Sequence, residues 1–222
     1  MSRSVLLLII GLLAHSCSQR SQPHPDKSLP LEITSSHLEK LDDALDQGEF
    51  SNLHSVLISQ NDSLLYKRYL PGQDFTWGNI DLGRVLYNDT TLHDVRSISK
   101  SVVSACIGIA LEEGMIDSLE QKVFDFFPEY ANYKDHLKEQ INLRHLLSMS
   151  DGLRWDESGT PVEGSEIEME NSINPVEFIL SQPMASSPGQ KWNYNGGATE
   201  LLAQVVHKQS GLTIYELSLI HI

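Results

Sequence analysis

Ser97-Ile98-Ser99-Lys100 opens the stretch that decides the fold, an almost wholly apolar run that continues to Glu113. Apolar side chains occupy nearly every direction around this run when it is drawn as a helix. A helix that is apolar on most sides must be buried on most sides. The sequence therefore predicts a buried core helix over residues 97–113, ended by Gly114, since glycine is the usual residue after a helix C-terminus.

The first turn of this helix carries a possible nucleophile. Ser97 and Lys100 are three residues apart, which places a hydroxyl and an amine one turn apart on one helix face. No other serine in the chain has a lysine three residues later. A serine becomes nucleophilic when a neighbour takes its proton. Lys100 can do so if burial or positive charge keeps it partly neutral, or it can stay charged and lower the pKa of a second base such as a tyrosine.

Two later stretches complete a set of three ordered motifs, Arg144-His145-Leu146-Leu147-Ser148-Met149-Ser150-Asp151-Gly152-Leu153 and Pro188-Gly189-Gln190-Lys191-Trp192-Asn193-Tyr194. With Ser97–Ser101 they resemble the serine beta-lactamase and penicillin-binding-protein superfamily. The set is similar to class C beta-lactamases and to the related esterases and nylon-oligomer hydrolases. The resemblance covers roughly residues 53–217.

The resemblance implies both a fold and a reaction. The fold would be of the α/β class, α+β type: an antiparallel sheet flanked by helices, with a mostly helical subdomain. The reaction would transfer an acyl group from an ester or amide to water, without a cofactor or metal. Ser97 would be the acylated nucleophile, Lys100 its proton partner, and Tyr194 the acid/base that protonates the leaving group. The amide N–H of Ser97 would form half of an oxyanion hole.

The chain departs from the family pattern twice. The family's second motif is Tyr-x-Asn, whereas here Gly196 holds the third place and Asn195 comes one position early. The third motif, K-T-G or H-x-G on a strand beside the serine, does not occur in the sequence. We therefore expect a C-terminally truncated hydrolase domain with little activity of its own, and a truncation or non-native tail over residues 217–222.

The N-terminus has the composition of a targeting segment. Arg3 precedes an apolar run over residues 5–14, too short to span a membrane and typical of a signal peptide. Cys17 follows it, as in bacterial lipoproteins, and is the predicted lipidation site; a plain secretory signal is the alternative. The predicted organisation is a signal peptide over 1–16, a lipid anchor and flexible tether over 17–30, and a partial hydrolase domain over 31–222.

Charge and cysteine content restrict the partners. The formal charge of −14 argues against nucleic acid, because phosphate binding needs a basic patch. We expect a monomeric, exported protein of the periplasm or cell envelope that acts on a small ester or amide and touches a membrane only through Cys17. Cys106, inside the apolar helix, is predicted to be a small buried hydrophobe.

Two other functions remain open at this stage. The protein could be a catalytically inactive, lipid-anchored binding protein that keeps the motifs as relics. It could also be a penicillin-binding D-Ala-D-Ala carboxypeptidase.

Local patterns predict the remaining elements. A capping box of Ser36 and Glu39 should begin a helix, and Asn61-Asp62 should turn a hairpin of strands 54–59 and 63–70. Residues 73–94 and the acidic tract 163–170 are predicted as loops. Short helices are expected over residues 119–127, 143–149, 175–180 and 198–209.

Three polar groups near the motifs receive separate interpretations. No direct catalytic role is expected for Ser150-Asp151-Gly152, although it mimics the S-D-N motif of class A enzymes. His145 is expected to be a structural hydrogen-bonding group. Trp155-Asp156-Glu157 fits either the wall of a cleft or a solvated loop.

Overall fold

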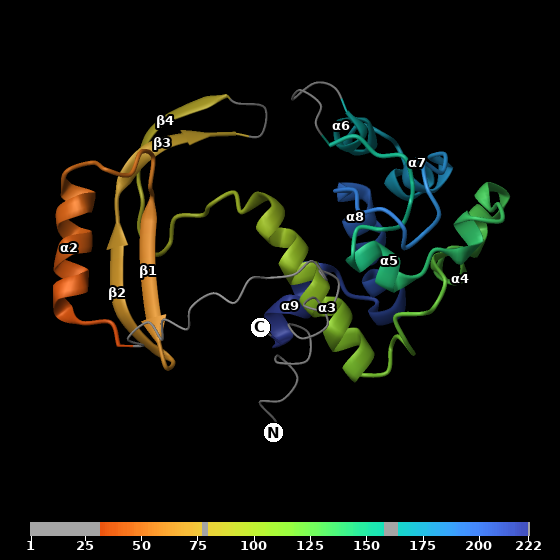
Figure 1. Ribbon diagram of the computed structural model, residues 1–222, viewed down its shortest axis with the longest axis horizontal. Coiled ribbons are helices and arrows are strands. Elements are labelled where there is room, and N and C mark those ends of the chain that lie inside the picture. Colours follow the sequence, from red (N-terminus) through yellow and green to blue (C-terminus); the bar gives the residue numbers. More distant parts are fainter. Residues whose placement is uncertain (1–31, 77–79, 158–163, 222) are drawn as a thin grey trace, which may run out of the picture. The chain divides into compact units, whose positions relative to one another are not determined.

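The computed structural model describes residues 32–76, 80–157 and 164–221. The chain divides into two compact units. Among the described residues, the first unit ends at Asp94 and the second begins at Val95. Helices and antiparallel strands make up the fold (Figure 1), as the α+β assignment requires. The predicted signal peptide, tether and lipidated Cys17 lie outside the described residues. Among the described helices, none is long and apolar enough to cross a membrane.

The first unit begins with helix α2 (Ser35–Asp46), which lies along the hairpin of strands β1 (Ser55–Gln60) and β2 (Ser63–Tyr69) (Figure 1). Its N-cap is Thr34, and the capping box pairs Thr34 with His37. The prediction of a box from Ser36 and Glu39 is wrong, because Thr34 already has the extended backbone that a cap requires and the helix starts directly after it.

The predicted hairpin is confirmed. Strands β1 (Ser55–Gln60) and β2 (Ser63–Tyr69) pair antiparallel. Asn61 and Asp62 turn the chain with φ angles of 50° and 61°. Two consecutive left-handed residues form the turn whose twist suits a hairpin, and Asn and Asp tolerate that conformation best after glycine.

A second hairpin occupies part of the segment predicted as a loop. Strands β3 (Pro71–Phe75) and β4 (Asp81–Leu86) pair antiparallel, with Gly72 opposite Val85. Proline is tolerated at the first position of a strand, so Pro71 opens β3 instead of ending the chain's extended structure. Gly72 is required by close packing, because a Cβ there would lie 2.2 Å from Cδ2 of His54.

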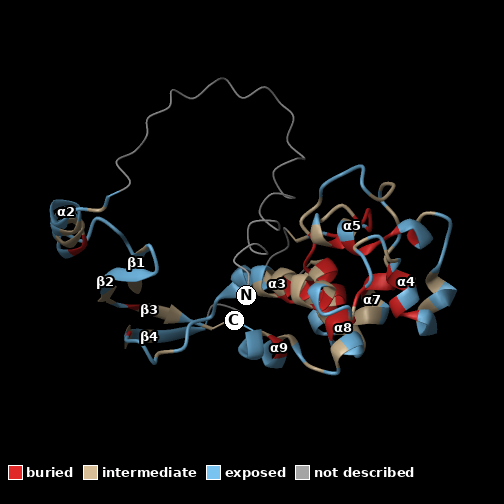
Figure 2. Ribbon diagram, turned by 90° about the horizontal axis from the view of Figure 1, so that it is seen from below, coloured by how far each residue is buried: buried red, intermediate tan, exposed pale blue. Residues whose placement is uncertain are grey.

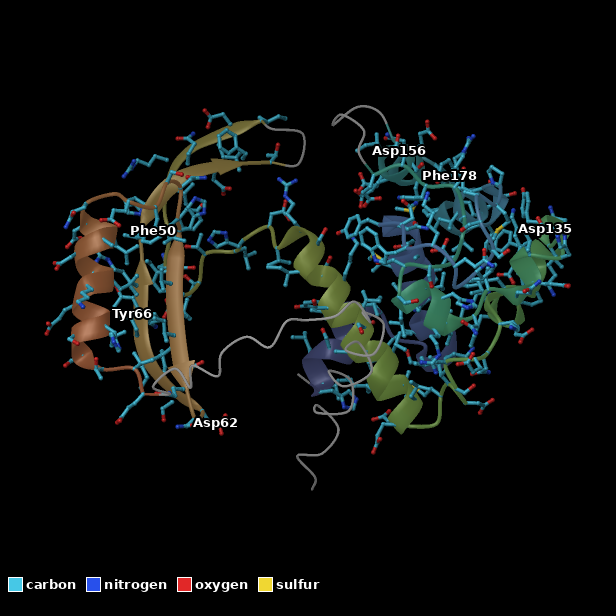
Figure 3. The ribbon with its side chains drawn as sticks, in the orientation of Figure 1. Phe50, Asp62, Tyr66, Asp135, Asp156 and Phe178 are labelled. Carbon is cyan, nitrogen blue, oxygen red and sulfur yellow. The ribbon has the colours of Figure 1, made fainter. Side chains whose placement is uncertain are left out.

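A carboxylate of α2 is bonded to strand β2. Tyr66, which faces α2 (Figure 3), donates its hydroxyl to Oδ1 of Asp42 at 2.5 Å, and Arg68 donates to the same oxygen at 2.7 Å. These hydrogen bonds, first that from Tyr66 and then that from Arg68, lower the pKa of Asp42 below its ordinary value of 3.8.

We expect the Asp42 bonds to stabilise the hairpin in a pH-dependent way. A lowered pKa in the folded state means that the contribution is present above the ordinary pKa and disappears as the pH falls below it. Hydrogen exchange of the β1–β2 amides should therefore be faster in Asp42→Asn than in wild type at pH 7, with the difference shrinking below about pH 4. Asp43→Asn, on the exposed side of α2, is the control. A difference that is constant with pH would contradict this account.

The second unit is a helical bundle around α8 (Gly196–Ser210). Most of its buried residues lie on α8 and on α3 (Ser99–Glu112), α4 (Val123–Phe126), α5 (Leu143–Leu147) and α7 (Pro175–Ser181) (Figure 2). The predicted core helix forms as α3 (Ser99–Glu112), which packs against α8 and α9 (Ile214–His221). Its buried residues are Val103, Cys106, Ile107 and Ala110, one stripe at helical spacing. Other apolar residues of α3, Val102, Ile109 and Leu111, are partly buried against the same core, whereas Ile98, in the 3₁₀ turn before α3, is exposed. Cys106 is fully buried, as predicted.

The shorter helices form near their predicted positions. Helix α7 is capped by the Asn174 side chain and opened by Pro175, and α8 ends at Gly211, whose φ is 74°. The remaining elements are η1 (Arg96–Ile98), α4 (Val123–Phe126), η2 (Pro128–Tyr133), η3 (Lys138–Gln140), α5 (Leu143–Leu147), α6 (Ser165–Glu170) and α7 (Pro175–Ser181).

One prediction for the later part of the chain is wrong. Residues 165–170 of the acidic tract form helix α6 instead of a loop, and Met169 among the glutamates is buried in the core. The last described residues belong to helix α9, with Leu217 buried in the core.

Candidate active site

Ser97 lies in the 3₁₀ turn η1, one turn ahead of the α-helix in which it was predicted. Arg96, directly before it, has a φ of 47°, a left-handed conformation that is uncommon for a residue with a side chain. Lys100 follows in the first turn of α3. The altered helix type does not separate the two side chains, since Nζ of Lys100 lies 3.3 Å from Oγ of Ser97.

Tyr194 joins this pair from a distant part of the sequence. Its hydroxyl donates to Oγ of Ser97 at 2.7 Å. The ammonium of Lys100 lies over the ring of Tyr194, 5.0 Å from its centroid. The structure thus brings Ser97, Lys100 and Tyr194 together, with the serine oxygen as the common partner of a phenol and an amine.

This arrangement can move a proton to and from the serine oxygen. A general base must lie within about 2.6–3.2 Å of the proton carrier, or one water away. The phenol of Tyr194 meets this condition directly, and the amine of Lys100 lies at its edge. Ser97 is exposed, so its oxygen is open to an incoming carbonyl.

Asn195 does not take the place of the family's motif asparagine. Its side-chain oxygen accepts the amide of Ala198 at 3.1 Å, which makes it the N-cap of α8. Its Nδ2 lies 3.2 Å and 3.3 Å from the carboxylate oxygens of Asp151. The carboxamide is therefore a buried structural group, as its early position in the motif suggested.

Two carboxylates occupy the space beside Gly196. A Cβ at this residue would lie 2.8 Å from Oε1 of Glu166 and 3.0 Å from Oε1 of Glu157. Glu157 accepts hydrogen bonds from the amide of Gly196, at 3.2 Å, and from the indole of Trp155. A side chain at position 196, such as the asparagine of the family motif, would have to displace these carboxylates.

The pKa of Glu166 is shifted by the groups around it. Burial raises the pKa of Glu166, the nearby carboxylate of Glu157 raises it further, and the ammonium of Lys100 acts in the opposite direction. A proton held by Glu166 would relieve the repulsion between the two acids. The sequence did not indicate Glu166 as a site neighbour, because it stands in an acidic tract interpreted as a loop. Glu157 belongs to a segment for which the sequence left both a cleft wall and a solvated loop open.

The remaining polar groups near the motifs are structural. The ring Nδ1 of His145 accepts the amide of Asn142 at 3.3 Å, and burial lowers the pKa of this histidine. Trp155 is buried in the helical core, and its ring packs edge to face with that of Phe178, with the ring centroids 6.2 Å apart. Within the described ranges, no group of three or more His, Cys, Asp or Glu residues is arranged to hold a metal ion.

Comparison with known proteins places the chain among relatives about twice its length. An uncharacterized protein of Alkalihalophilus pseudofirmus is 25% identical over 166 residues, which are 73% of this chain and 39% of that protein. A Bacillus anthracis structure assigned as a 6-aminohexanoate-dimer hydrolase has a TM-score of 0.57 at 22% identity, covering 78% of this chain and 44% of the other. FmtA from Staphylococcus aureus has a TM-score of 0.60 at 22% identity, covering 83% and 47%.

These structures share the fold with this chain, and the chain spans less than half the length of each of these relatives. A family model described as Beta-lactamase matches residues 51–218, a range that includes Ser97, Lys100 and Tyr194. Because this match covers well over half of the sequence, the chain belongs to the beta-lactamase family.

Proposed function

We propose that this protein is a serine hydrolase that acts on an ester or amide carbonyl through an acyl-enzyme at Ser97. The observation that carries the proposal is the convergence on Oγ of Ser97 of the phenol of Tyr194, at 2.7 Å, and the amine of Lys100, at 3.3 Å. A hydroxyl that contacts two groups able to exchange protons fits nucleophilic catalysis.

Together with water, the side chains of Ser97, Lys100 and Tyr194 are sufficient for every proton transfer of the proposed reaction. Tyr194 first loses its own proton to solvent; it then takes the proton of Ser97, and Oγ adds to the carbonyl carbon to form a tetrahedral intermediate. The intermediate expels an alcohol or amine, which receives its proton from Tyr194. Water then loses a proton to Tyr194 and attacks the acyl ester to form a second tetrahedral intermediate. Its collapse breaks the bond to Oγ and releases a carboxylic acid, while Tyr194 returns the proton to Oγ of Ser97. Lys100 stabilises the phenolate by its positive charge above the ring.

The neighbourhood of Gly196 supports a substrate other than a penicillin. The family's motif asparagine is replaced by glycine, and the carboxylates of Glu157 and Glu166 stand where its side chain would begin. Simple esters and amides do not depend on a donor at that position. The relative assigned as a 6-aminohexanoate-dimer hydrolase is named for an amide substrate, which makes short linear amides the first compounds to test beside esters.

The test is covalent labelling of the intact chain by a fluorophosphonate, because this reagent reports nucleophilicity of a serine without requiring turnover. We expect mass spectrometry to place the label on Ser97, and Ser97→Ala to remove it. Ser99→Ala is the matched control, since Ser99 is exposed nearby and bonds to the carbonyl of Arg96. An unlabelled wild-type chain with intact helical circular dichroism would overturn the proposal and favour a binding protein.

Two substrates then separate the enzyme classes. Slow release of p-nitrophenol from an acetate ester without uptake of penicillin is expected for the proposed hydrolase, because a partial domain is expected to have little activity of its own. Stable acylation of Ser97 by penicillin, with no ester turnover, would identify a carboxypeptidase of the penicillin-binding type and contradict the proposed substrate class.

A further inference from the structure

Asp151 is a buried carboxylate that the proposed reaction does not use. It lies in the loop of residues 149–155, and its side chain is only 2% exposed. Its Oδ1 accepts the amide of Leu153 at 2.9 Å, and both its oxygens lie within 3.3 Å of Nδ2 of Asn195. Burial raises the pKa of Asp151, while these hydrogen bonds act against that shift. A buried carboxylate is costly unless hydrogen-bond donors surround it, and the amide of Leu153 and Nδ2 of Asn195 are donors to Asp151.

The partner of this carboxylate is held in one orientation. Asn195 is 1% exposed, and its Oδ1 is occupied by the amide of Ala198 at the start of α8. The Nδ2 group must therefore face Asp151, because a flipped amide would lose both bonds. The Asp151–Asn195 pair thus joins the 149–155 loop to the first turn of α8.

Tyr194 lies between this pair and a second set of bonds to the same loop. On its other side, the amide of Asn193 donates to the carbonyl of Met149 at 2.9 Å, and Nδ2 of Asn193 donates to the carbonyl of Trp155 at 3.0 Å. Both neighbours of Tyr194 are therefore attached to the 149–155 loop. The loop itself is tightly packed, since a Cβ at Gly152 would lie 2.3 Å from the carbonyl oxygen of Ser186.

We propose that Asp151 is a positioning residue, which acts through Asn195 to hold the phenol of Tyr194 within hydrogen-bonding distance of Oγ of Ser97. The inference rests on the proposed function for its effect on rate. Proton transfer depends steeply on distance, and a displacement of about 1 Å in an active site can cost about 10²-fold in rate. Asp151 touches neither the serine nor the phenol, so its contribution passes through the backbone between Asn195 and Tyr194.

Exchanging the two side chains tests this proposal. Asn195→Asp replaces the amide donor by a second carboxylate about 3 Å from Asp151. The two carboxylates repel each other when both are ionised, so the comparison is made at high pH, because at low pH they can share a proton and stay together. The double variant Asp151→Asn with Asn195→Asp restores one amide facing one carboxylate. It also keeps an oxygen for the amide of Leu153 and another for the amide of Ala198. A merely structural pair would change unfolding without changing the rate of the folded protein.

We expect Asn195→Asp to lower the fluorophosphonate labelling rate of Ser97 by about 10- to 100-fold at temperatures where the chain stays folded, and the exchanged pair to recover most of that loss. Asn174→Asp, the same change at the N-cap of α7, is the matched control and should label at the wild-type rate. If Asn195→Asp fails to fold, Asp151→Ala, measured with the exchanged pair, provides the same comparison.

A second readout does not depend on reactivity. With tyrosine labelled by ¹³C at Cζ, the Tyr194 resonance is identified as the one absent from Tyr194→Phe. We expect it to move in the single variant and to return in the exchanged pair. A folded single variant with the wild-type rate and resonance, or an exchanged pair that restores neither, would overturn the proposal. An unlabelled wild type whose resonance behaves as expected would reject the proposed function and leave the positioning role supported.

Discussion

Replacing Tyr194 by phenylalanine is expected to slow labelling and acylation of Ser97 by about 10²- to 10⁴-fold, the usual size of a general acid–base contribution. The substitution removes only the hydroxyl that lies 2.7 Å from Oγ of Ser97. The aromatic ring, which packs beneath the ammonium of Lys100, is retained. The loss should therefore appear in the rate of the chemical step, with little change in the stability of the fold.

The measurement is the single-exponential rate of fluorophosphonate labelling across a pH series. Tyr215→Phe, which removes an exposed hydroxyl from α9, is the matched control and should label as wild type does. Lys100→Met should show a loss of similar size, and the double variant should lose little more, because groups that act as one unit are not additive. A Tyr194→Phe chain within about threefold of the wild-type rate would contradict the role of the phenol as proton carrier.

The largest loss of stability is expected from Phe127→Ala, at about 3–5 kcal/mol, the range for truncating a buried phenylalanine. Phe127 is completely buried in the helical core. The ammonium of Lys208 lies 4.7 Å from the ring centroid and donates to the carbonyl of Phe126 at 3.0 Å. Removing the ring leaves a cavity in the helical core and takes away the aromatic partner of the Lys208 ammonium.

Urea unfolding followed by far-ultraviolet circular dichroism measures this loss, since the helical unit dominates that signal. Phe50→Ala is the control, because Phe50 is 52% exposed and should cost less than about 1 kcal/mol. Equal midpoints for the two variants would show that α4 does not pack as described.

The helices could largely be predicted from local chemistry. Asn174-Pro175 and Gly211 mark helix ends by their own hydrogen bonds and backbone angles, which need no distant partner. Asn61-Asp62 marks the hairpin turn for the same reason. Strands β3 and β4 could not be found in this way, because their stability comes from pairing with each other and their residues lack an alternating apolar pattern.

The sequence by itself determined that Ser97 and Lys100 lie on one helix face, because a spacing of three residues makes their side chains neighbours. The family resemblance named Tyr194, but only the tertiary structure brings its phenol to that serine, since Tyr194 is 97 residues further along the chain. It also decided that Asp151 faces Asn195 and that Glu166 lies beside Gly196. Such contacts depend on how separate segments exclude water together, and no local pattern of residues encodes that.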